Sequence, residues 1–543
     1  MEPAIVEPAP RRKRKRKAAP TAAAPGAYDL GFALTLGALS GLLYALTLPG
    51  FELWPLALVA QAPLVIALRG QAPRRAALVG LAAGLVMAAL GAPWIAGTVA
   101  RFGEVPWPLA LPIAFLVWAE MAGRMAALGW LTARAEARGW PASIAFVAAF
   151  GATELVYPVI FPWFFAVTVR AVPALVQGAE LGGPYLVSLV LLGPSLALAE
   201  AIWARRVGRA IDRRLVAVGI ATPVLAAAVG LARIAQVDAR TAAAPAIRIG
   251  LAQGNQPAKG RKQSVATYRR LTADLRDQGV DLVVWPEGAL PEVYPEATYP
   301  ADLRAAVTGT LGVPVVFGGG VVREVGGRKR ETNTAFLADA SGEILGRYDK
   351  AHLVPFGEYL PLGDAIPSLY ALAPNTSHLL AGDSVDPLVW GDRRLAALIC
   401  YEDMLPQYVN RMVSRTDPDL LVNLTIDTWF GNTMEPWSHL ALAEIRAIEH
   451  RRFLVRSTNS GVSAVIDPVG RRVAVSSVFR EETIVAEVRW LRGKTVYEVI
   501  GDGPMWLVTA ASVAMALRAR RKAGEAGAGP DRPVSRGRSS TGA

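Results

Sequence analysis

Apolar residues follow two different patterns along this chain of 543 residues. Over the first 240 residues, long apolar stretches alternate with short polar connections, and a helix that spans a membrane needs about 20 such residues. Seven stretches predict transmembrane helices and an eighth lies near the end of the chain, at 29–48, 54–68, 76–100, 107–131, 142–169, 180–204, 214–236 and 504–519. The second stretch is short, so a re-entrant segment is the alternative there. Pro158, Pro162 and Pro173 predict that the fifth ends in an irregular, partly embedded loop.

Between residues 246 and 503 the pattern changes to short β-rich runs that alternate with helical stretches. The runs predict strands at 247–251, 281–285, 313–317, 395–400 and 420–424. Apolar periodicity predicts helices at 264–278 and 437–450. We therefore expect an α/β or α+β domain, and its roughly 250 residues are enough for one large core.

The two patterns divide the chain into five predicted parts. They are a disordered basic arm at 1–28, a transmembrane helical domain at 29–240, an α/β domain at 241–503, a C-terminal transmembrane helix at 504–519 and a disordered basic tail at 520–543. The composition agrees, because 52% of the residues are apolar and the mean hydropathy is +0.32. These values argue against a purely cytosolic enzyme and against a disordered chain.

Positive charge is bunched along the chain, which carries a net charge of +12. Residues 11–17 are all Arg or Lys; a nucleic-acid or nuclear-localisation motif is the alternative there, but we expect no nucleic-acid partner. Cytoplasmic loops of membrane proteins carry excess Arg and Lys. If the basic arm is cytoplasmic, the connections after the second, fourth and sixth stretches are cytoplasmic as well. These connections carry the excess positive charge, at Arg69, Arg74, Arg75, Arg134, Arg138, Arg205, Arg206, Arg209, Arg213 and Arg214. Both termini are therefore predicted to be cytoplasmic, with residues 240–503 outside.

Three predicted strand ends carry residues that together would suit a nucleophilic enzyme: Glu287, Lys350 and Cys400. Each has an ordinary explanation alone, since a Glu after Trp-Pro is usually a solvated turn residue and a single Cys is often buried filler. As a set they supply a carboxylate base, an ammonium group and a thiol, which are the groups needed to form and stabilise a thiolate. Cys400 is the one cysteine of the chain, so no intramolecular disulfide can form.

The order Glu, Lys, Cys resembles the nitrilase superfamily. With membrane stretches on both sides, the chain resembles the apolipoprotein N-acyltransferase family over residues 29–519. The motifs that carry the resemblance are Pro-Glu at 286–287, Lys-x-His-Leu-Val-Pro-Phe-Gly-Glu-Tyr-x-Pro at 350–361, Ile-Cys-Tyr-Glu at 399–402, Gln-Gly-Asn at 253–255, Asp-Thr-Trp-Phe-Gly at 427–431, Arg-Ala-Ile-Glu at 446–449, Arg-Ser-Thr-Asn-Ser-Gly at 456–461, and Thr-x-Tyr at 495–497 before Gly-Asp at 501–502.

The resemblance implies a fold and a set of site residues. The fold is a polytopic α-helical membrane bundle of about eight spans joined to an α/β nitrilase-like αββα sandwich domain. Glu287 is then the general base, Lys350 the oxyanion-stabilising cation and Cys400 the nucleophile. Accessory or oxyanion positions are Glu358, Tyr401 and Glu402, and the substrate-binding positions are Tyr359, Trp429 and Phe430.

The resemblance also implies a reaction. Cys400 would take an acyl chain from a membrane phospholipid as a thioester and pass it to the α-amino group of a diacylglyceryl-modified apolipoprotein. We expect a monomer in the bacterial inner membrane, with its catalytic domain on the periplasmic side and no cofactor. The alternatives are a membrane-tethered amidase that uses water as acceptor, and a catalytically silent envelope scaffold. The four histidines do not cluster with Cys400 at zinc-ligand spacing, so we predict no metal.

Five other features bear on the site. The apolar segment 353–374 follows Lys350 and predicts a lipid-accessible region, with an ordinary core-lining segment as the alternative. His439 could orient Trp429 or a carboxylate, but a satisfied core histidine is the favoured interpretation. Gly318–Gly320 predicts close backbone packing. The chain lacks the Trp that the family often has after Gln-Gly-Asn, and it has Ile426 where Asn is usual.

Overall fold

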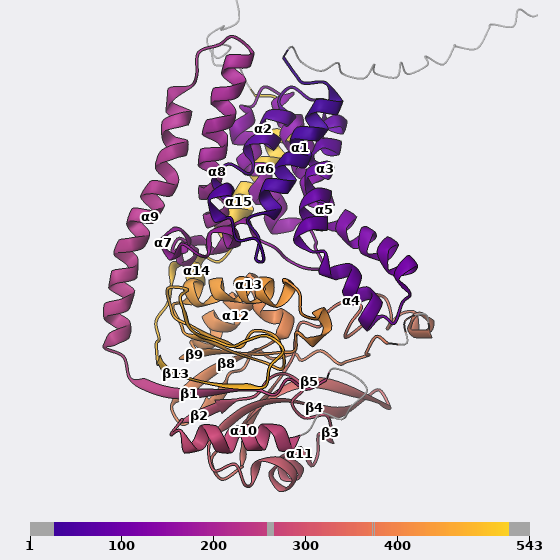
Figure 1. Cartoon of the computed structure of the whole chain (residues 1–543), viewed down its shortest axis with the longest axis vertical. Helices are drawn as coiled ribbons and strands as arrows, with labels where there is room; N and C mark the ends of the chain where they lie inside the picture. Colours follow the sequence, from indigo (N-terminus) through magenta and orange to yellow (C-terminus); the bar gives the residue numbers. More distant parts are fainter. Residues whose placement is uncertain (1–25, 258–264, 372, 374, 521–543) are drawn as a thin grey trace, which may run out of the picture.

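The computed structural model describes residues 26–257, 265–371, 373 and 375–520. The predictions of a disordered arm and tail fall almost entirely outside these residues, as does the Arg/Lys run at 11–17. Within them, the chain forms a bundle of helices followed by a two-sheet domain, and its last helix returns to the bundle (Figure 1).

Each predicted membrane stretch contains at least one apolar helix. In the described part of the chain, four helices are long and apolar enough to cross a membrane, and four shorter apolar helical segments account for the other stretches. The long ones are α3 (Pro73–Gly91), α5 (Trp107–Glu136), α8 (Ala179–Arg206) and α9 (Arg213–Ala242). The shorter ones are α1 (Leu30–Ala45), η1 with α2 (Trp54–Leu58 and Ala62–Leu68), α6 (Ala142–Val156) and α15 (Gly503–Leu517). The bundle architecture is confirmed, and the count of eight spans is approximate.

Two predicted stretches are interrupted. The stretch 76–100 was expected as one span, but α3 ends at Gly91 and a separate helix α4 (Trp94–Phe102) follows Pro93. Pro93 cannot donate a backbone hydrogen bond, and it restricts the residue before it. The fifth stretch is helical only to Val156, and an irregular segment then leads to η2 (Phe165–Val169) and the short helix α7 (Pro173–Val176). An irregular end was predicted there, because Pro158 disfavours helix at the preceding residue.

The second half of the chain contains two β-sheets. The seven-stranded sheet has the order β13-β1-β2-β4-β5-β6, with β3 paired to β4, and the six-stranded sheet has the order β12-β11-β10-β9-β8-β7. The strands are β1 (Ala246–Gln253), β2 (Leu282–Val284), β3 (Val293–Pro295), β4 (Val315–Val325), β5 (Arg328–Ala338), β6 (Ile344–Asp349), β7 (Leu388–Trp390), β8 (Arg393–Ile399), β9 (Leu420–Thr425), β10 (Leu454–Thr458), β11 (Ala464–Ile466), β12 (Arg472–Val475) and β13 (Glu482–Arg489).

The two sheets form the middle of an αββα sandwich. Helices α10 (Val265–Asp277) and α11 (Tyr299–Leu303) lie on the outer side of the first sheet, and α12 (Pro406–Thr416) and α13 (Glu435–His450) lie between the second sheet and the bundle (Figure 1). Met404, Leu442 and Ile445 belong to the same hydrophobic core as residues of the bundle helices. The second helical layer therefore rests directly on the membrane helices, and the predicted sandwich is confirmed.

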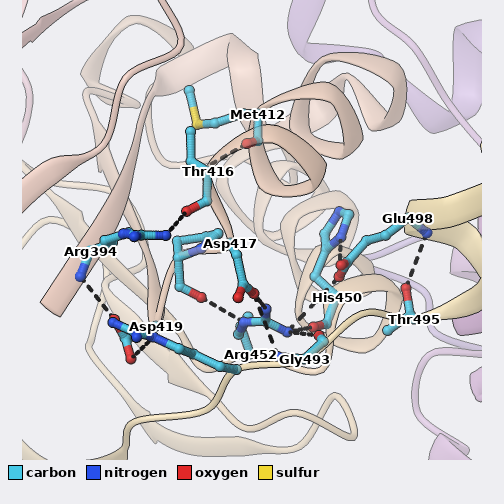
Figure 2. A network of polar contacts seen from close by, with 12 residues as sticks. Arg394, Met412, Thr416, Asp417, Asp419, His450, Arg452, Gly493, Thr495 and Glu498 are labelled. Atoms are coloured by element: carbon cyan, nitrogen blue, oxygen red, sulfur yellow. Dashed lines mark hydrogen bonds and ion pairs between the residues drawn. The ribbon is translucent and has the colours of Figure 1, made fainter.

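A buried polar network fastens the end of the sandwich before the chain re-enters the bundle (Figure 2). Arg452 donates hydrogen bonds to the carbonyls of Pro418 and Gly493 and to Asp417 Oδ1. Thr495 caps the short helix α14 (Val496–Ile500) and donates to a carbonyl of α13. The segment that leads to α15 is thus tied to the helical layer that faces the bundle.

Candidate active site

The three chemistry-bearing residues each follow the end of a strand. Glu287 lies three residues after β2, Lys350 directly follows β6, and Cys400 directly follows β8, which ends one residue earlier than predicted. The first two strands belong to one sheet and β8 belongs to the other. The site therefore lies where the two sheets of the sandwich meet. Gly318 lies against it, because a Cβ there would be 2.6 Å from the carbonyl oxygen of Pro286, so the predicted close packing is confirmed.

The ammonium group of Lys350 lies between two carboxylates. Its Nζ atom donates to Glu358 Oε1 at 2.8 Å and lies 3.5 Å from Glu287 Oε1. Asn333 Nδ2, from β5, donates to the same two oxygens at 2.7 Å for Glu287 and 3.0 Å for Glu358. Lys350 is only 1% exposed. The two donors hold both carboxylates in fixed positions.

The second carboxylate oxygen of Glu287 is not bound by Lys350 or Asn333. Glu287 Oε2 is buried and accepts no hydrogen bond from the part of the chain that the structure describes. The Cys400 thiol interacts with both Glu287 and Lys350. A buried carboxylate that interacts with a thiol is a suitable proton acceptor.

Burial and charge set the protonation states of these groups. Burial raises the pKa of Glu287 above its usual range, against the nearby ammonium of Lys350. Burial alone would lower the pKa of Lys350, but the carboxylates of Glu358 and Glu287 outweigh it and raise that pKa. Burial and the Glu287 charge raise the pKa of Cys400, and Lys350 lowers it. The thiol is therefore protonated at rest.

The turn at Cys400 is conformationally strained. Its φ angle is +52°, in the left-handed region that residues other than Gly rarely adopt. It starts the short 3₁₀ helix η5 (Cys400–Met404) immediately after β8. Such strain persists only where the surroundings enforce the conformation, so the neighbours of this turn determine the position of the Cys400 thiol.

Glu402 enforces the turn from one side. Its two oxygens accept four hydrogen bonds, from the backbone N–H groups of Ile399, Ala351 and His352 and from the Tyr348 hydroxyl. The side chain is fully buried, and burial raises its pKa to about 7. Glu402 thus joins the turn of Cys400 to the backbone that follows Lys350, which is a structural contact beneath the site.

Tyr401 reaches the bundle. Its hydroxyl donates to the carbonyl of Ile160 at 2.9 Å, in the irregular segment after α6. The Tyr359 side chain lies close enough to interact with Tyr401. The residue after Cys400 is therefore held by a segment of the helical bundle.

Trp429 and Phe430 also face the bundle. The ring of Trp429 packs edge-on against Phe102 at 4.6 Å between centroids, and Phe430 packs against Trp94 at 5.1 Å. Arg101 donates to the Phe430 carbonyl at 2.7 Å. All three partners lie on α4, so the predicted substrate-binding aromatics lie at the junction between this helix and the sandwich.

His439 belongs to a buried charge network. Its Nε2 is hydrogen-bonded to Asp403 at 2.9 Å and its Nδ1 to Asp427 at 3.0 Å, and Arg456 bonds both carboxylates. His439 is thus buried with both ring nitrogens satisfied, as favoured, and it also orients two carboxylates, which was part of the alternative. Asp427, Glu435 and His439 are close enough for one cation to reach an atom of each, but both ring nitrogens of His439 are already engaged. That the chain binds no metal remains a prediction.

Sequence reasoning did not identify Asn333. It lies in the run Glu-Thr-Asn-Thr-Ala, where the flanking threonines are buried, and an unexplained polar cluster in a buried strand was the available signal. Its two carboxylate partners are 46 and 25 residues away in sequence. Only the pairing of the strands brings them together.

The chain is similar to known proteins over most of its length. Residues 40–197 match the model of the apolipoprotein N-acyltransferase N-terminal domain, and residues 248–493 match that of carbon-nitrogen hydrolases. The apolipoprotein N-acyltransferase of Geobacter metallireducens is 31% identical, with 90% of this chain and 95% of that protein covered. The one from Azotobacter vinelandii is 33% identical, with 90% and 96% covered. Among solved structures, an amidase from Nesterenkonia sp. is 22% identical over 45% of this chain and 90% of its own, with a TM-score of 0.33.

Proposed function

Because the chain belongs to the apolipoprotein N-acyltransferase family, we propose that Glu287, Lys350 and Cys400 carry acyl transfer from a phospholipid to a lipoprotein amine. The observation that carries this assignment is the Lys350 ammonium held between two carboxylates, one of which, Glu287, also interacts with the Cys400 thiol. This arrangement provides a base, a cation and a nucleophile in one water-poor site.

The first half-reaction forms a thioester. Glu287 Oε2 removes the Cys400 proton while the sulfur attacks the ester carbonyl of the phospholipid. Negative charge develops on the carbonyl oxygen, where the Lys350 ammonium and the backbone N–H of Tyr401 are the proposed donors. As the C–O bond breaks, Glu287 returns the proton to the leaving alcohol, which departs as a lysophospholipid.

The second half-reaction breaks the thioester. The α-amino group of the diacylglyceryl-modified cysteine attacks the same carbonyl carbon, forming a C–N bond as the C–S bond breaks. Glu287 accepts the proton that the amine loses and passes it to the departing sulfur, which restores the thiol. Glu287 can therefore act as the base in both half-reactions, because it gains one proton and gives one up in each.

Glu358 and Glu402 are assigned supporting roles. Glu358 bonds Lys350 with one oxygen and the backbone N–H of Val354 with the other, so it orients the ammonium. Glu402 maintains the turn of Cys400 through its four hydrogen bonds. Neither needs to touch the substrate.

Lipid access is proposed from the bundle side of the site. Trp429 and Phe430 lie against α4. The segment after Lys350 exposes Phe356, Leu362 and Ile366, which are 55%, 71% and 47% accessible. Exposed apolar groups beside membrane helices suit contact with acyl chains, and this favours the lipid-accessible interpretation of residues 353–374.

The orientation follows from charge. The connection between α8 and α9, rich in arginine in the sequence, lies at the end of the bundle far from the sandwich (Figure 1). Arg101 and Arg170, the arginines of the opposite connections, instead contact residues on the sandwich side, including Phe430 and Glu444. With the basic end in the cytoplasm, the sandwich would face the periplasm of the bacterial inner membrane. A monomer is sufficient for the chemistry proposed.

The direct test is mass spectrometry of a lipoprotein N-terminus. A diacylglyceryl-modified acceptor is incubated with the purified protein and phospholipid, and the expected product is heavier by one acyl group on the α-amine. Free fatty acid as the main product, or hydrolysis of lipid-free amides, would instead support the amidase alternative. An acceptor whose mass does not change in the presence of the protein and phospholipid would contradict the proposal. The Cys400→Ala protein is the control.

A further inference from the structure

A buried ion pair lies inside the membrane bundle. Arg124 of α5 and Glu154 of α6 are 6% and 7% exposed, and Arg124 Nη1 lies 3.9 Å from Glu154 Oε1. Ionisable groups in a membrane bundle are costly, and in general they mark a function. Neither residue touches Glu287, Lys350 or Cys400.

Both members of the pair bind backbone groups at the irregular segment between α6 and η2. Arg124 binds within this segment, residues 157–164, and Glu154 binds Phe165, which directly follows it. Arg124 Nη1 donates to the Trp163 carbonyl at 2.9 Å, and Glu154 Oε1 accepts from the Phe165 N–H at 2.8 Å. Backbone groups that leave a helix inside a bundle need such partners, because no lipid group can replace them. The ion pair therefore holds the segment in one conformation.

The segment in turn holds the residue next to the nucleophile. In a continuous helix the Ile160 carbonyl would accept the N–H four residues later. Because α6 ends at Val156, that carbonyl is available, and the Tyr401 hydroxyl donates to it at 2.9 Å. The path from the ion pair to the strained Cys400 turn therefore consists of two hydrogen bonds and a short piece of backbone.

We propose that Arg124 and Glu154 are positioning residues for the nucleophile. They fix residues 157–164 so that Ile160 can anchor Tyr401, and Tyr401 fixes the left-handed turn at Cys400. The inference rests on the proposed function of Cys400. It assigns the membrane bundle a part in aligning the thiol as well as in binding lipid.

The test is a double-mutant cycle on thioester formation. Single-turnover rates at saturating phospholipid are measured for Arg124→Met, Tyr401→Phe and the double variant. Each single variant should lose about 10- to 100-fold, the cost expected for a misplaced reacting group. If the two residues act along one path, the double variant loses no more than the slower single variant.

The control is an ion pair between the sandwich and the bundle. Arg451 Nε donates to Glu180 Oε2 at 2.7 Å, and Arg451 also bonds Gln177 and the Pro468 carbonyl, away from residues 157–164. Glu180→Gln should combine with Tyr401→Phe multiplicatively. If Arg124→Met does not fold, Glu154→Gln takes its place in the cycle, and Arg124→Lys, which retains a donor, should recover most of the rate.

The outcomes separate the two proposals. A wild-type protein that forms no acyl-enzyme would refute the proposed function itself. A wild-type protein that does form it, with multiplicative losses for Arg124→Met and Tyr401→Phe, would overturn the positioning role. Changes in KM for phospholipid with an unchanged single-turnover rate would overturn it as well.

Discussion

Replacing Lys350 by Met removes the charge between Glu287 and Glu358 while preserving most of the side-chain stem. At the 3.5 Å separation of Nζ from Glu287 Oε1 and an effective dielectric constant of about 20, the lost attraction is about 5 kcal/mol. The pKa of Glu287, already raised by burial, therefore rises further, and the carboxyl is protonated at neutral pH.

A protonated Glu287 cannot accept the Cys400 proton. We expect thioester formation at pH 7 to fall roughly 100- to 1,000-fold in Lys350→Met. The sign of the pH dependence follows: ionised Glu287 increases as pH rises through its raised pKa, so the variant should recover rate toward high pH where the wild type has already levelled off. The assay is single-turnover formation of the acyl-enzyme from phospholipid between about pH 6 and 10.

Lys494→Met is the matched control, because Lys494 is exposed in the same domain. It should keep both the rate and the pH profile of the wild type. A Lys350→Met protein with the wild-type rate at pH 7 would show that Lys350 neither controls Glu287 nor stabilises the oxyanion. A uniformly slow variant without recovery at high pH would assign Lys350 to the oxyanion alone.

Three further predictions follow from other contacts. Asn333→Leu removes the donor shared by two carboxylates, so the rising limb of the pH–rate profile should shift to higher pH, whereas Asn410→Leu, far from the carboxylates, should leave it unchanged. Glu402→Gln replaces a carboxylate oxygen by an NH2 group, so at least one of the four buried hydrogen bonds is lost. The free energy of unfolding, measured by thermal denaturation, should fall by about 1–3 kcal/mol. An unaltered stability would contradict the structural role of Glu402. Reporter fusions after Arg240 and after Arg521 should behave as periplasmic and cytoplasmic respectively, and a cytoplasmic signal at Arg240 would reverse the orientation.

The architecture was largely predictable because each half has its own hydrophobic period. Stretches of membrane length and short apolar strand runs cannot be confused. The interruptions of the predicted membrane stretches were harder to predict. Pro158 indicated the end of α6, but Pro93 lies within an apolar stretch whose length predicts a single span. A proline can kink a membrane helix or end it, and the packing of the neighbouring segments decides which.

The site was predictable where chemistry follows a strand. Glu287, Lys350 and Cys400 follow β2, β6 and β8, and the geometry brings their side chains together. Asn333 was not predictable, because its importance depends on the pairing of β5 with β6 and on side chains far away in sequence. The link from Arg124 to Tyr401 depends on contacts between the bundle and the sandwich, which local sequence patterns do not encode.

The account depends most directly on a thioester at Cys400. The decisive measurement is the intact mass of the protein after incubation with phospholipid alone, before and after treatment with neutral hydroxylamine. We predict a gain of one acyl chain that hydroxylamine removes, that added lipoprotein acceptor also removes, and that Cys400→Ala never acquires. A preparation that acylates lipoprotein without ever carrying such an adduct, or a Cys400→Ala protein with wild-type turnover, would contradict the account.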